Sequence, residues 1–530
     1  MAALEEPLLL KDLYPDCPGC KSAHLSKKGA RAPIKELICL GLLVLCNALP
    51  ICSLYPFLYF MVRDFHIAKS QKDIGYYAGV VGSSFMVGRF FTGLSWGVIA
   101  DKYGRKAVMY AGILSVIVFN TGFGLSNGFW MAVVTRFLLG IFNGMLGTLQ
   151  AYATEICSEE HQPLGLSVVS TLWGLGLIIG PALGGYLSQP AIKYPNIFKN
   201  SLFDRFPYFL PCLCITIFAV VTLAITFVLP ETWHNHETTH AKSSNDNGSD
   251  IKSQSRDATP SAVESGLATT ENAPKKKTLL KNRPLLASVA VFCIWSMHDI
   301  AYTEIFSLWA LSPTSLGGLS LRSTDVGNVF AVSGFCMLVF QLSLFPRFTH
   351  RLGPIIVVRI AAILTVPLLA ACSYFSLLSK LWLWVAILPT NIFKNIFSVS
   401  ITTGSFLLIN NSVTHDQRGA ANGISMSMVS LFKAVGPAGG GALFAWSQTR
   451  TQASFLPGVQ LVFFCLNIIA IITIVATFEP FLPKSTNRPI QDKIIITGRL
   501  VDGEGEINKR GDVSQKRENE PSSPRKGERH

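Results

Sequence analysis

The sequence predicts an all-α membrane protein whose twelve transmembrane helices form two pseudo-symmetric six-helix bundles. Hydrophobic residues make up 49% of the 530 residues and charged residues only 15%, a charge content too low for an ordinary soluble domain. Long apolar runs recur along the chain, and a glycine–proline motif of the first half recurs in the second half. These three observations together support the fold class.

Each expected span is an apolar run long enough to cross the hydrocarbon core, which takes about 20 residues. Charged or turn-forming residues bound each run. The first 36 residues hold no long apolar run, so no cleavable signal peptide is expected. The spans are expected near residues 37–61, 75–99, 107–126, 129–150, 164–188, 207–230, 285–311, 325–346, 355–378, 381–409, 419–447 and 459–482.

The distribution of basic residues predicts the orientation. Of the 45 Lys and Arg residues, 31 fall in the tails and even-numbered connections and 9 in the odd-numbered connections. Because positive charge accumulates on the cytosolic side, both termini are expected in the cytosol. Residues 231–284, between the halves, are rich in polar residues and contain few apolar ones, which predicts a disordered cytosolic linker. The expected organisation is a tail (1–36), a bundle (37–230), the linker (231–284), a second bundle (285–482) and a tail (483–530).

An internal repeat relates the two halves. The run Gly180-Pro181-Ala182-Leu183-Gly184-Gly185 recurs as Gly436-Pro437-Ala438-Gly439-Gly440-Gly441, 256 residues later. Glycine lets helices touch and proline bends them, so these positions are candidate hinges, although tight packing alone requires the same residue types. A parallel repeat places a binding site near the midplane, between the halves. The hinge candidates are Gly180, Pro181, Gly184, Gly185, Gly436 and Pro437.

The connection after the second span carries the most specific motif. Residues Gly97-Val98-Ile99-Ala100-Asp101-Lys102-Tyr103-Gly104-Arg105-Lys106 resemble the cytosolic signature loop of the major facilitator superfamily, G-x-x-x-D-R/K-x-G-R-R/K. Gly97 permits close helix approach, Gly104 supplies a tight turn, and Asp101 can cap a helix or pair with a basic side chain. We expect Gly97, Asp101, Gly104, Arg105 and Lys106 to form a conformational latch. A plain basic loop is the alternative.

Two further motifs resemble those of the same superfamily. Arg136, in Arg136-Phe137-Leu138-Leu139-Gly140, resembles its R-x-x-x-G motif, and a guanidinium inside a span normally faces a cavity or an acid. The run from Gly176 to Gly185 resembles the G-x-x-x-G-P-x-x-G-G motif of drug/proton antiporters. That resemblance implies an antiporter, while simple packing remains the alternative interpretation.

A closer resemblance covers nearly the whole chain. It is carried by Cys17-Pro18-Gly19-Cys20, Trp96-Gly97, Pro230-Glu231-Thr232, the run from His298 to Phe306, and the runs Arg418 to Gly423 and Ser430 to Pro437. These segments are similar to the plant zinc-induced facilitator-like transporters. The resemblance implies a proton-coupled exporter of the vacuolar or plasma membrane, tied to zinc and iron homeostasis through chelators such as nicotianamine or phytosiderophores. Potassium and auxin are the alternative substrates that it implies.

The span 285–311 holds two acids away from its ends, Asp299 and Glu304. A nonpolar environment favours the neutral form of a carboxyl group, so an acid at this depth can exchange a proton near neutral pH. Five residues at about 100° each place the two acids roughly 140° apart around the helix. One acid therefore faces the cavity while the other pairs laterally. Glu304 is the favoured proton carrier, Asp299 the second candidate, and a structural ion pair the alternative.

Basic and polar side chains within the spans are the candidate substrate contacts. Lys433 takes the place of Leu177 in the repeat, an asymmetry that packing does not require, and can bind carboxylates or pair with Glu304 or Asp299. The alternative is a lysine whose amine reaches the membrane interface. This basic character favours anionic or zwitterionic cargo over a bare metal ion. The candidates are Lys433, Arg136, Arg89, Lys394, His298 and Tyr302, of which His298 is also a plausible packing residue.

Candidate metal ligands lie outside the spans, in two sets. Cys17, Cys20 and His24 form the first set, and His234, His236 and His240 form the second. Each set offers three ligands that zinc accepts, but neither completes a tetrahedral site. Regulatory zinc binding, or a non-transporting zinc sensor, is therefore the less favoured interpretation.

These observations also define what is not expected. No nucleophile and base set, phosphate loop or complete metal site is evident, so neither an enzyme nor a bound cofactor is expected. The net charge of +13 is mostly topological, so nucleic acid is not an expected partner. The expected partners are protons, a small-molecule substrate and the bilayer, and the expected state is a monomer. An acidic dileucine pattern, Glu5 to Leu10, favours the vacuolar membrane.

Overall fold

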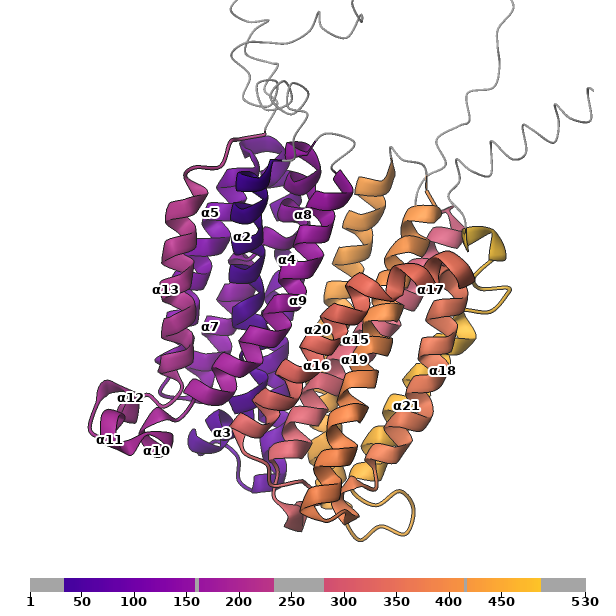
Figure 1. Cartoon of the computed structure of the whole chain (residues 1–530). Coiled ribbons are helices and arrows are strands. Elements are labelled where there is room, and N and C mark those ends of the chain that lie inside the picture. The colour runs from indigo at the N-terminus through magenta and orange to yellow at the C-terminus, as the bar shows by residue number, and fades with distance from the viewer. Residues whose placement is uncertain (1–32, 158–161, 233–280, 414–416, 488–530) are drawn as a thin grey trace, which may run out of the picture.

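The computed structural model describes residues 33–157, 162–232, 281–413 and 417–487. Within these ranges the chain is helical, without strands, and forms two halves that lie side by side (Figure 1). The N-terminal half, indigo to magenta, ends at Thr232, and the C-terminal half, orange to yellow, begins at Lys281. The repeat in the sequence therefore corresponds to a division in space.

The N-terminal half contains the first six spans and a group of short helices before the sixth. A π-helical segment, Val116–Asn120, joins α5 to α6. The helices are α2 (Ile34–Cys52), α3 (Tyr55–Asp64), α4 (Ile74–Tyr103), α5 (Arg105–Ser115), α6 (Thr121–Gly124), α7 (Phe129–Phe142), α8 (Met145–Ile156), α9 (Gln162–Leu187), α10 (Pro190–Lys193), α11 (Pro195–Phe198), α12 (Leu202–Arg205) and α13 (Phe209–Thr226).

The C-terminal half contains the last six spans. One additional helix, α17, lies between the eighth and ninth spans and carries basic residues in its last turn. The helices are α15 (Arg283–Leu311), α16 (Ser323–Ser343), α17 (Phe345–Leu352), α18 (Pro354–Cys372), α19 (Lys380–Asn411), α20 (Arg418–Thr449) and α21 (Val459–Ala476).

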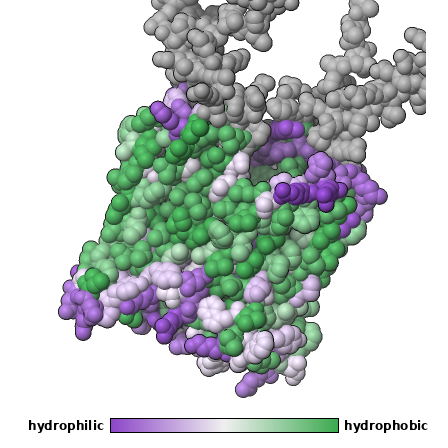
Figure 2. Space-filling view, in the orientation of Figure 1, coloured by the Kyte–Doolittle hydropathy of each residue, from purple (hydrophilic) through white to green (hydrophobic). Residues whose placement is uncertain are grey.

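Eleven helical segments of the described chain are long and apolar enough to cross a membrane. The 30-residue helix α4 is long enough as well, but glycine, serine and Arg89 lower its mean hydropathy. Figure 2 shows the expected consequence, a broad apolar belt with hydrophilic residues gathered towards the two ends. The all-α membrane fold predicted from the sequence is confirmed.

Two predicted spans contain a break that was not predicted, because each consists of two helices. In the first, α2 ends at Cys52, two residues after Pro50, and α3 begins at Tyr55 with Pro56 in its first turn. Proline lacks the amide donor that a continuous helix needs, so the chain restarts there. In the fourth, α7 and α8 are separated at Gly144, which packs directly against the Trp96 ring.

The bundle has two distinct ends. The end where α2 and α15 begin and α13 ends, at the top of Figure 1, is called the tail end. The opposite end, called the loop end, carries the short helices α10, α11 and α12. Under the basic-residue distribution of the sequence, the tail end is the expected cytosolic end.

At the loop end, the two halves touch along two interfaces, α9 with α16 and α4 with α20. In the first, a Cβ built on Gly185 would lie 3.0 Å from the Gly327 Cα. In the second, a Cβ built on Gly441 would lie 2.9 Å from the Gly79 Cα. Only glycine permits such close backbone approach, so both interfaces are closed in this structure.

The α4–α20 interface opens towards the tail end. Gly82, Gly93 and Gly97 share one face of α4 by helical periodicity, and Gly82 packs on Pro437. A Cβ built on Gly93, on Gly97, or on Gly423 of α20 would meet no atom within 4 Å. The surface is hollowed between the two halves at this end (Figure 2). The structure is therefore closed at the loop end and open at the tail end.

Candidate functional site

Glu304 is fully buried where α15 meets the α4–α20 interface. Its relative exposure is 0%, and neither carboxyl oxygen has a hydrogen-bond partner among the described residues. A Cβ built on Gly82 would lie 3.0 Å from Glu304 Oε2 and 3.1 Å from Pro437 Cβ, so the carboxyl group sits against both. The acid is thus placed on the surface that closes the loop end.

Arg136 is the charged group that acts on Glu304 from the other half. It is 2% exposed, and its Nη1 donates to the Pro50 carbonyl at 2.9 Å. Pro50 lies in the last turn of α2, where a carbonyl lacks a helical partner, so the cation satisfies that acceptor. The guanidinium also lies over the rings of Phe85 and Phe123, at 5.5 and 5.3 Å. Arg136 and Glu304 form no direct ion pair.

Asp299 pairs inside the C-terminal half instead. Its Oδ1 accepts from Lys394 Nζ at 2.6 Å and from Ser398 Oγ at 2.5 Å. The Lys394 ammonium is fully buried and lies 4.0 Å above the Tyr302 ring, while the Asp299 side chain is 35% exposed. The two acids of α15 therefore occupy different environments, one paired and partly accessible, the other unpaired and buried.

His298 and Tyr302 lie in the interior of the C-terminal half. The His298 ring is fully buried and stacks on Trp295 at 4.6 Å, and neither ring nitrogen has a partner among the described residues. The Tyr302 hydroxyl and the Asn391 amide nitrogen are likewise buried without partners in this part of the chain. Because unpartnered buried polar groups cost free energy, their clustering beside Lys394 marks a polar region built for something other than packing.

Lys433 and Arg89 are half-buried cations on opposite halves. Neither forms a side-chain hydrogen bond or ion pair with another described residue, and Lys433 interacts electrostatically with both Asp299 and Arg89. The suggested pairing of Lys433 with Glu304 or Asp299 does not occur, because Lys394 occupies the Asp299 carboxylate. Sequence reasoning ranked Lys394 below Lys433 and did not identify its partner.

The loop motif is joined to two acids that sequence reasoning missed. Arg105 pairs with Glu155 of α8 at 2.9 Å, and Thr232 Oγ1 donates to the same carboxylate. The backbone amides of Arg105 and Lys106 donate to Glu231 at 3.0 and 3.2 Å, which caps the first turn of α5. Gly104 has φ +99, a conformation that favours glycine. The sequence did contain a signal for these pairings, because the basic loop motif and both acids lie at the ends of predicted spans.

The other expected latch residues form no side-chain hydrogen bond or ion pair with these two acids in the described part of the structure. Lys106 Nζ donates to the Leu229 carbonyl at 2.7 Å, near the end of α13. A Cβ built on Gly97 would meet none of the described residues within 4 Å, because α4 faces the tail-end opening there. Asp101 lies in the last turn of α4, and its side chain is outside the described part of the structure.

In each half, some candidate hinge residues pack on a helix of the same half and others contact a helix of the opposite half. Gly180 and Gly184 pack on Cys52 and Ser53 of the same half, and Gly436 packs on α15 of its own half. Pro181 and Gly185 contact α16 across the division, and Pro437 contacts α4 across it. Each glycine–proline helix therefore joins its own first span to the opposite half, which is the position a hinge requires.

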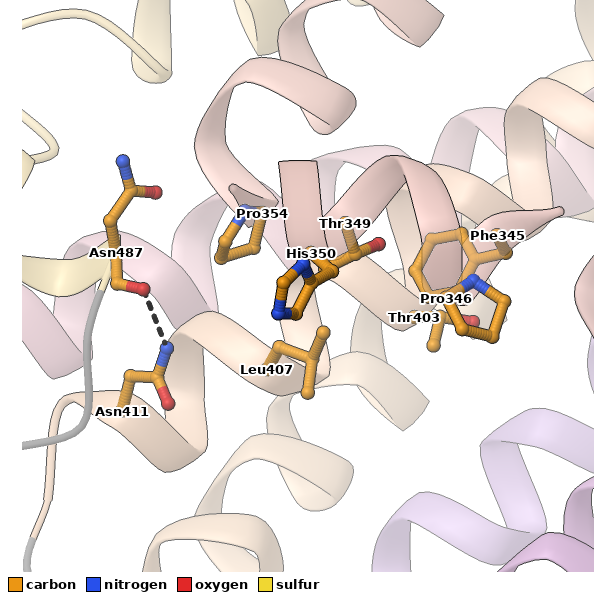
Figure 3. A pocket seen from close by; sticks show the side chains of 9 residues that line it. All are labelled: Phe345, Pro346, Thr349, His350, Pro354, Thr403, Leu407, Asn411 and Asn487. Carbon is orange, nitrogen blue, oxygen red and sulfur yellow. Dashed lines mark hydrogen bonds between the residues drawn. The ribbon is translucent and has the colours of Figure 1, made fainter. Parts of the chain in front are cut away.

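The proposed regulatory metal ligands Cys17, Cys20, His24, His234, His236 and His240 lie outside the described residues. Among the described residues, no group of three His, Cys, Asp or Glu side chains could hold a metal ion. A cavity of about 440 Å³ lies elsewhere, between α17, α18 and α19 at the tail end (Figure 3). It is lined mainly by apolar atoms, with His350, Asn411 and Asn487 at its edge, and it does not reach the ionisable groups of α15.

Comparison with known proteins agrees with this architecture. The model of the Major Facilitator Superfamily matches residues 40–392. The protein ZINC INDUCED FACILITATOR-LIKE 1 of Arabidopsis thaliana is 50% identical over 91% of this chain and 98% of its own length. The protein ZINC INDUCED FACILITATOR 1 of Arabidopsis thaliana is 48% identical over 91% of this chain and 99% of its own.

Among solved structures, a D-xylose–proton symporter matches with a TM-score of 0.62 over 86% of this chain and 99% of its own. Its identity of 13% supports the fold alone. The chain belongs to the major facilitator superfamily and, within it, to the zinc-induced facilitator-like membrane transporters.

Proposed function

We propose that the protein is a proton-coupled antiporter that exports a small organic metal chelator, such as nicotianamine or a phytosiderophore, or its metal complex, from the cytosol. The family supports transport of a small molecule, and the names of its relatives connect them with zinc. The proposed location is the vacuolar or plasma membrane, with both termini and the tail end in the cytosol. The proposed role is in zinc and iron homeostasis.

Proton coupling is supported by one observation, the burial of Glu304 between the closed halves without a hydrogen-bond partner in the described part of the chain. An ionised carboxylate there would lack every compensating hydrogen bond, which is costly in a dry interior. We propose that Glu304 carries a proton while the loop end is closed. Loss of that proton then destabilises the α4–α20 interface and favours its opening.

This linkage fixes the direction of exchange. Proton release towards the cytosolic tail end favours opening of the loop end, and cargo leaves there. Proton uptake from the acidic loop side allows the interface to close again, and the tail end reopens. Protons therefore move inward as cargo moves outward, which is antiport. Arg136, buried on the facing half, stabilises the ionised form of Glu304 during the transition.

The chemistry of the opening favours carboxylate cargo. Arg89 and Lys433 are cations that pair with none of the described residues, which suits an anion or zwitterion and disfavours potassium. Auxin is an organic carboxylate and is therefore the alternative cargo that the same observation supports. A zinc sensor without transport requires the Cys and His sets, which lie outside the described residues.

The test is transport by the purified full chain in liposomes. An acidic lumen should drive uptake of nicotianamine, and the E304Q variant should lower that uptake to the level of protein-free liposomes. Glutamine resembles the protonated acid, so E304Q should hold the loop end closed and should also abolish counterflow exchange, while nicotianamine binding from the open tail end stays intact. Uptake of indole-3-acetate and potassium in the same liposomes separates the alternative cargoes.

The exposed tail-end acid Glu479 provides the matched control, because E479Q removes an acid outside the interface. This variant should keep gradient-driven uptake. If E304Q retained the full pH dependence of uptake, Glu304 would not be the coupling group. If no chelator or auxin exchanged at all while potassium did, the cargo assignment would be wrong.

A further inference from the structure

Arg89 and Lys433 lie at the level where the closed α4–α20 interface begins to open. Arg89 follows Gly82 by seven residues on the same face of α4, and Lys433 precedes Pro437 by four residues on α20. Gly82 and Pro437 touch, whereas a Cβ built on Gly93, one turn beyond Arg89, would meet none of the described residues within 4 Å. Met86 and Ala434 still pack in one cluster between these levels. The two cations therefore flank the inner limit of the tail-end opening.

Partners distinguish these two cations from the other basic residues inside the spans. Lys394 pairs with Asp299, Arg136 donates to Pro50, and Arg359 donates to Thr477 at 2.7 Å. Arg89 and Lys433 form no hydrogen bond or ion pair with the residues that the structure describes. Arg89 belongs to the N-terminal half and Lys433 to the C-terminal half, and their positive charges repel each other. A half-buried cation without a partner at membrane depth normally marks a ligand pathway.

A partly accessible acid completes this neighbourhood. Asp299 uses Oδ1 for both Lys394 and Ser398, and its Oδ2 accepts no hydrogen bond from the described residues. Its side chain is 35% exposed and interacts electrostatically with Lys433. The opening therefore offers two cationic donors and one free carboxylate oxygen.

We propose that Arg89 and Lys433 together bind a carboxylate of the cargo, one from each half, and that Asp299 Oδ2 accepts from an ammonium of the same molecule. The ligand class is a zwitterion that carries carboxylate and ammonium groups. This assignment rests on the proposed transport function, because it locates the cargo site.

The bound carboxylate also changes the energetics of closure. Without cargo, repulsion between Arg89 and Lys433 keeps the halves apart at the tail end. A carboxylate between them provides a charge-assisted hydrogen bond to each and turns repulsion into attraction. Cargo binding therefore permits the tail end to close, and an empty carrier stays open to the cytosol.

Equilibrium binding to the purified full chain, at one pH and without a gradient, tests the site. The probes are nicotianamine and its carboxyl methyl ester. R89M and K433M should each weaken nicotianamine binding about tenfold or more, the effect of losing one charge-assisted hydrogen bond. K433R should restore most of the affinity, and K380M, which removes an exposed lysine of α19, should leave affinity unchanged.

Ester binding supplies the second readout, because the ester cannot form these ionic contacts. It should be weak in the wild type and insensitive to R89M and K433M. Unchanged nicotianamine affinity in both variants would overturn the proposal, as would an equal loss of ester and acid binding. Failure of proton coupling at Glu304 would leave these affinities intact, so the two proposals fail separately.

Discussion

The α9–α16 and α4–α20 interfaces are built alike but carry different chemistry. In both, a glycine–proline helix from one half packs through glycine on a helix of the other half, Gly185 on Gly327 and Gly441 on Gly79. The first interface includes a neutral contact, in which Tyr186 donates to Asn328 at 2.7 Å, and Lys193 lies at its loop end. Glu304, Arg89 and Lys433 all lie along the second. Where α20 carries Lys433, the repeat places Leu177 in α9.

This difference indicates that the repeated glycine contacts allow the halves to move. The residues that differ between the repeats, such as Lys433, provide the groups that bind protons and cargo. Two equivalent glycine contacts allow both halves to rock about similar positions. At the level of the spans, Glu304, Arg89 and Lys433 make opening and closing of the α4–α20 interface depend on protons and cargo. The following predictions test whether the packing is equivalent and whether the chemistry is confined to one side.

The largest effect is expected from filling a glycine contact. A Cβ on Gly441 would lie 2.9 Å from the Gly79 Cα, and a Cβ on Gly185 would lie 2.8 Å from the Ser323 carbonyl oxygen. G441V and G185V should therefore prevent loop-end closure and abolish transport in liposomes. Gly439 belongs to the same motif, but a Cβ there would meet nothing within 4 Å. G439V should keep near-normal transport, and equal loss in all three variants would refute the packing argument.

The next effect concerns the paired acid behind the α4–α20 interface. D299N leaves the Lys394 ammonium fully buried and without its counter-charge. Removing one partner of a fully buried ion pair costs about 3–5 kcal/mol of folding free energy. The cost here should be smaller because Asp299 is partly exposed, but the thermal unfolding midpoint in detergent should still fall. The double variant D299N/K394M should recover most of the lost stability, because it leaves no buried charge without a counter-charge. A D299N protein as stable as wild type would show that the pair is not structural.

The smallest effect is expected at the loop end of the α9–α16 interface. Lys193 Nζ donates to the Gly185 carbonyl at 2.5 Å and to Ser323 Oγ of α16 at 3.0 Å. Burial lowers the pKa of Lys193 from 10.5 to about 8, and no acid among the described residues pairs with it. Opening exposes the amine and returns its pKa towards 10.5. The closed state thus binds this proton more weakly and gains stability as pH rises from about 8 to 10.5.

Hydrogen exchange of residues 181–187 and 323–328 measures this effect, after correction for the intrinsic pH dependence of exchange. Protection should increase modestly between pH 8 and 10.5 in the wild type and stay constant below pH 8. K193M should abolish the increase. K199M, which removes an exposed lysine of the same connection, should retain it. A K193M protein with the wild-type profile would assign the pH dependence to another group.

Much of the fold followed from local properties of the chain. Apolar runs located the spans, and the repeat predicted two halves, because hydrophobic length and composition are readable without neighbours. The breaks after Pro50 and at Gly144 were missed. Pro50 carried a local signal, since proline removes a donor, but the Gly144 break depends on the Trp96 ring of another helix.

The site was predictable in its residue types and not in its pairings. Asp299, Glu304, Lys433 and Arg89 stand out because charge inside a span is expensive. Glu155 and Glu231, which bind the Arg105 segment, were overlooked because they lie at span ends, where acids are common.

The sequence by itself determined which side chains are forced into the membrane and which glycines allow two helices to touch. Only the tertiary structure decided that Lys394 neutralises Asp299, that Glu304 stays without a partner, and that Arg89 and Lys433 flank the open end. The physical reason is that pairing requires two atoms within about 3–4 Å, and that distance depends on the rotation and tilt of helices far apart in the chain. Local sequence fixes each helix but not the angle at which it meets its neighbour.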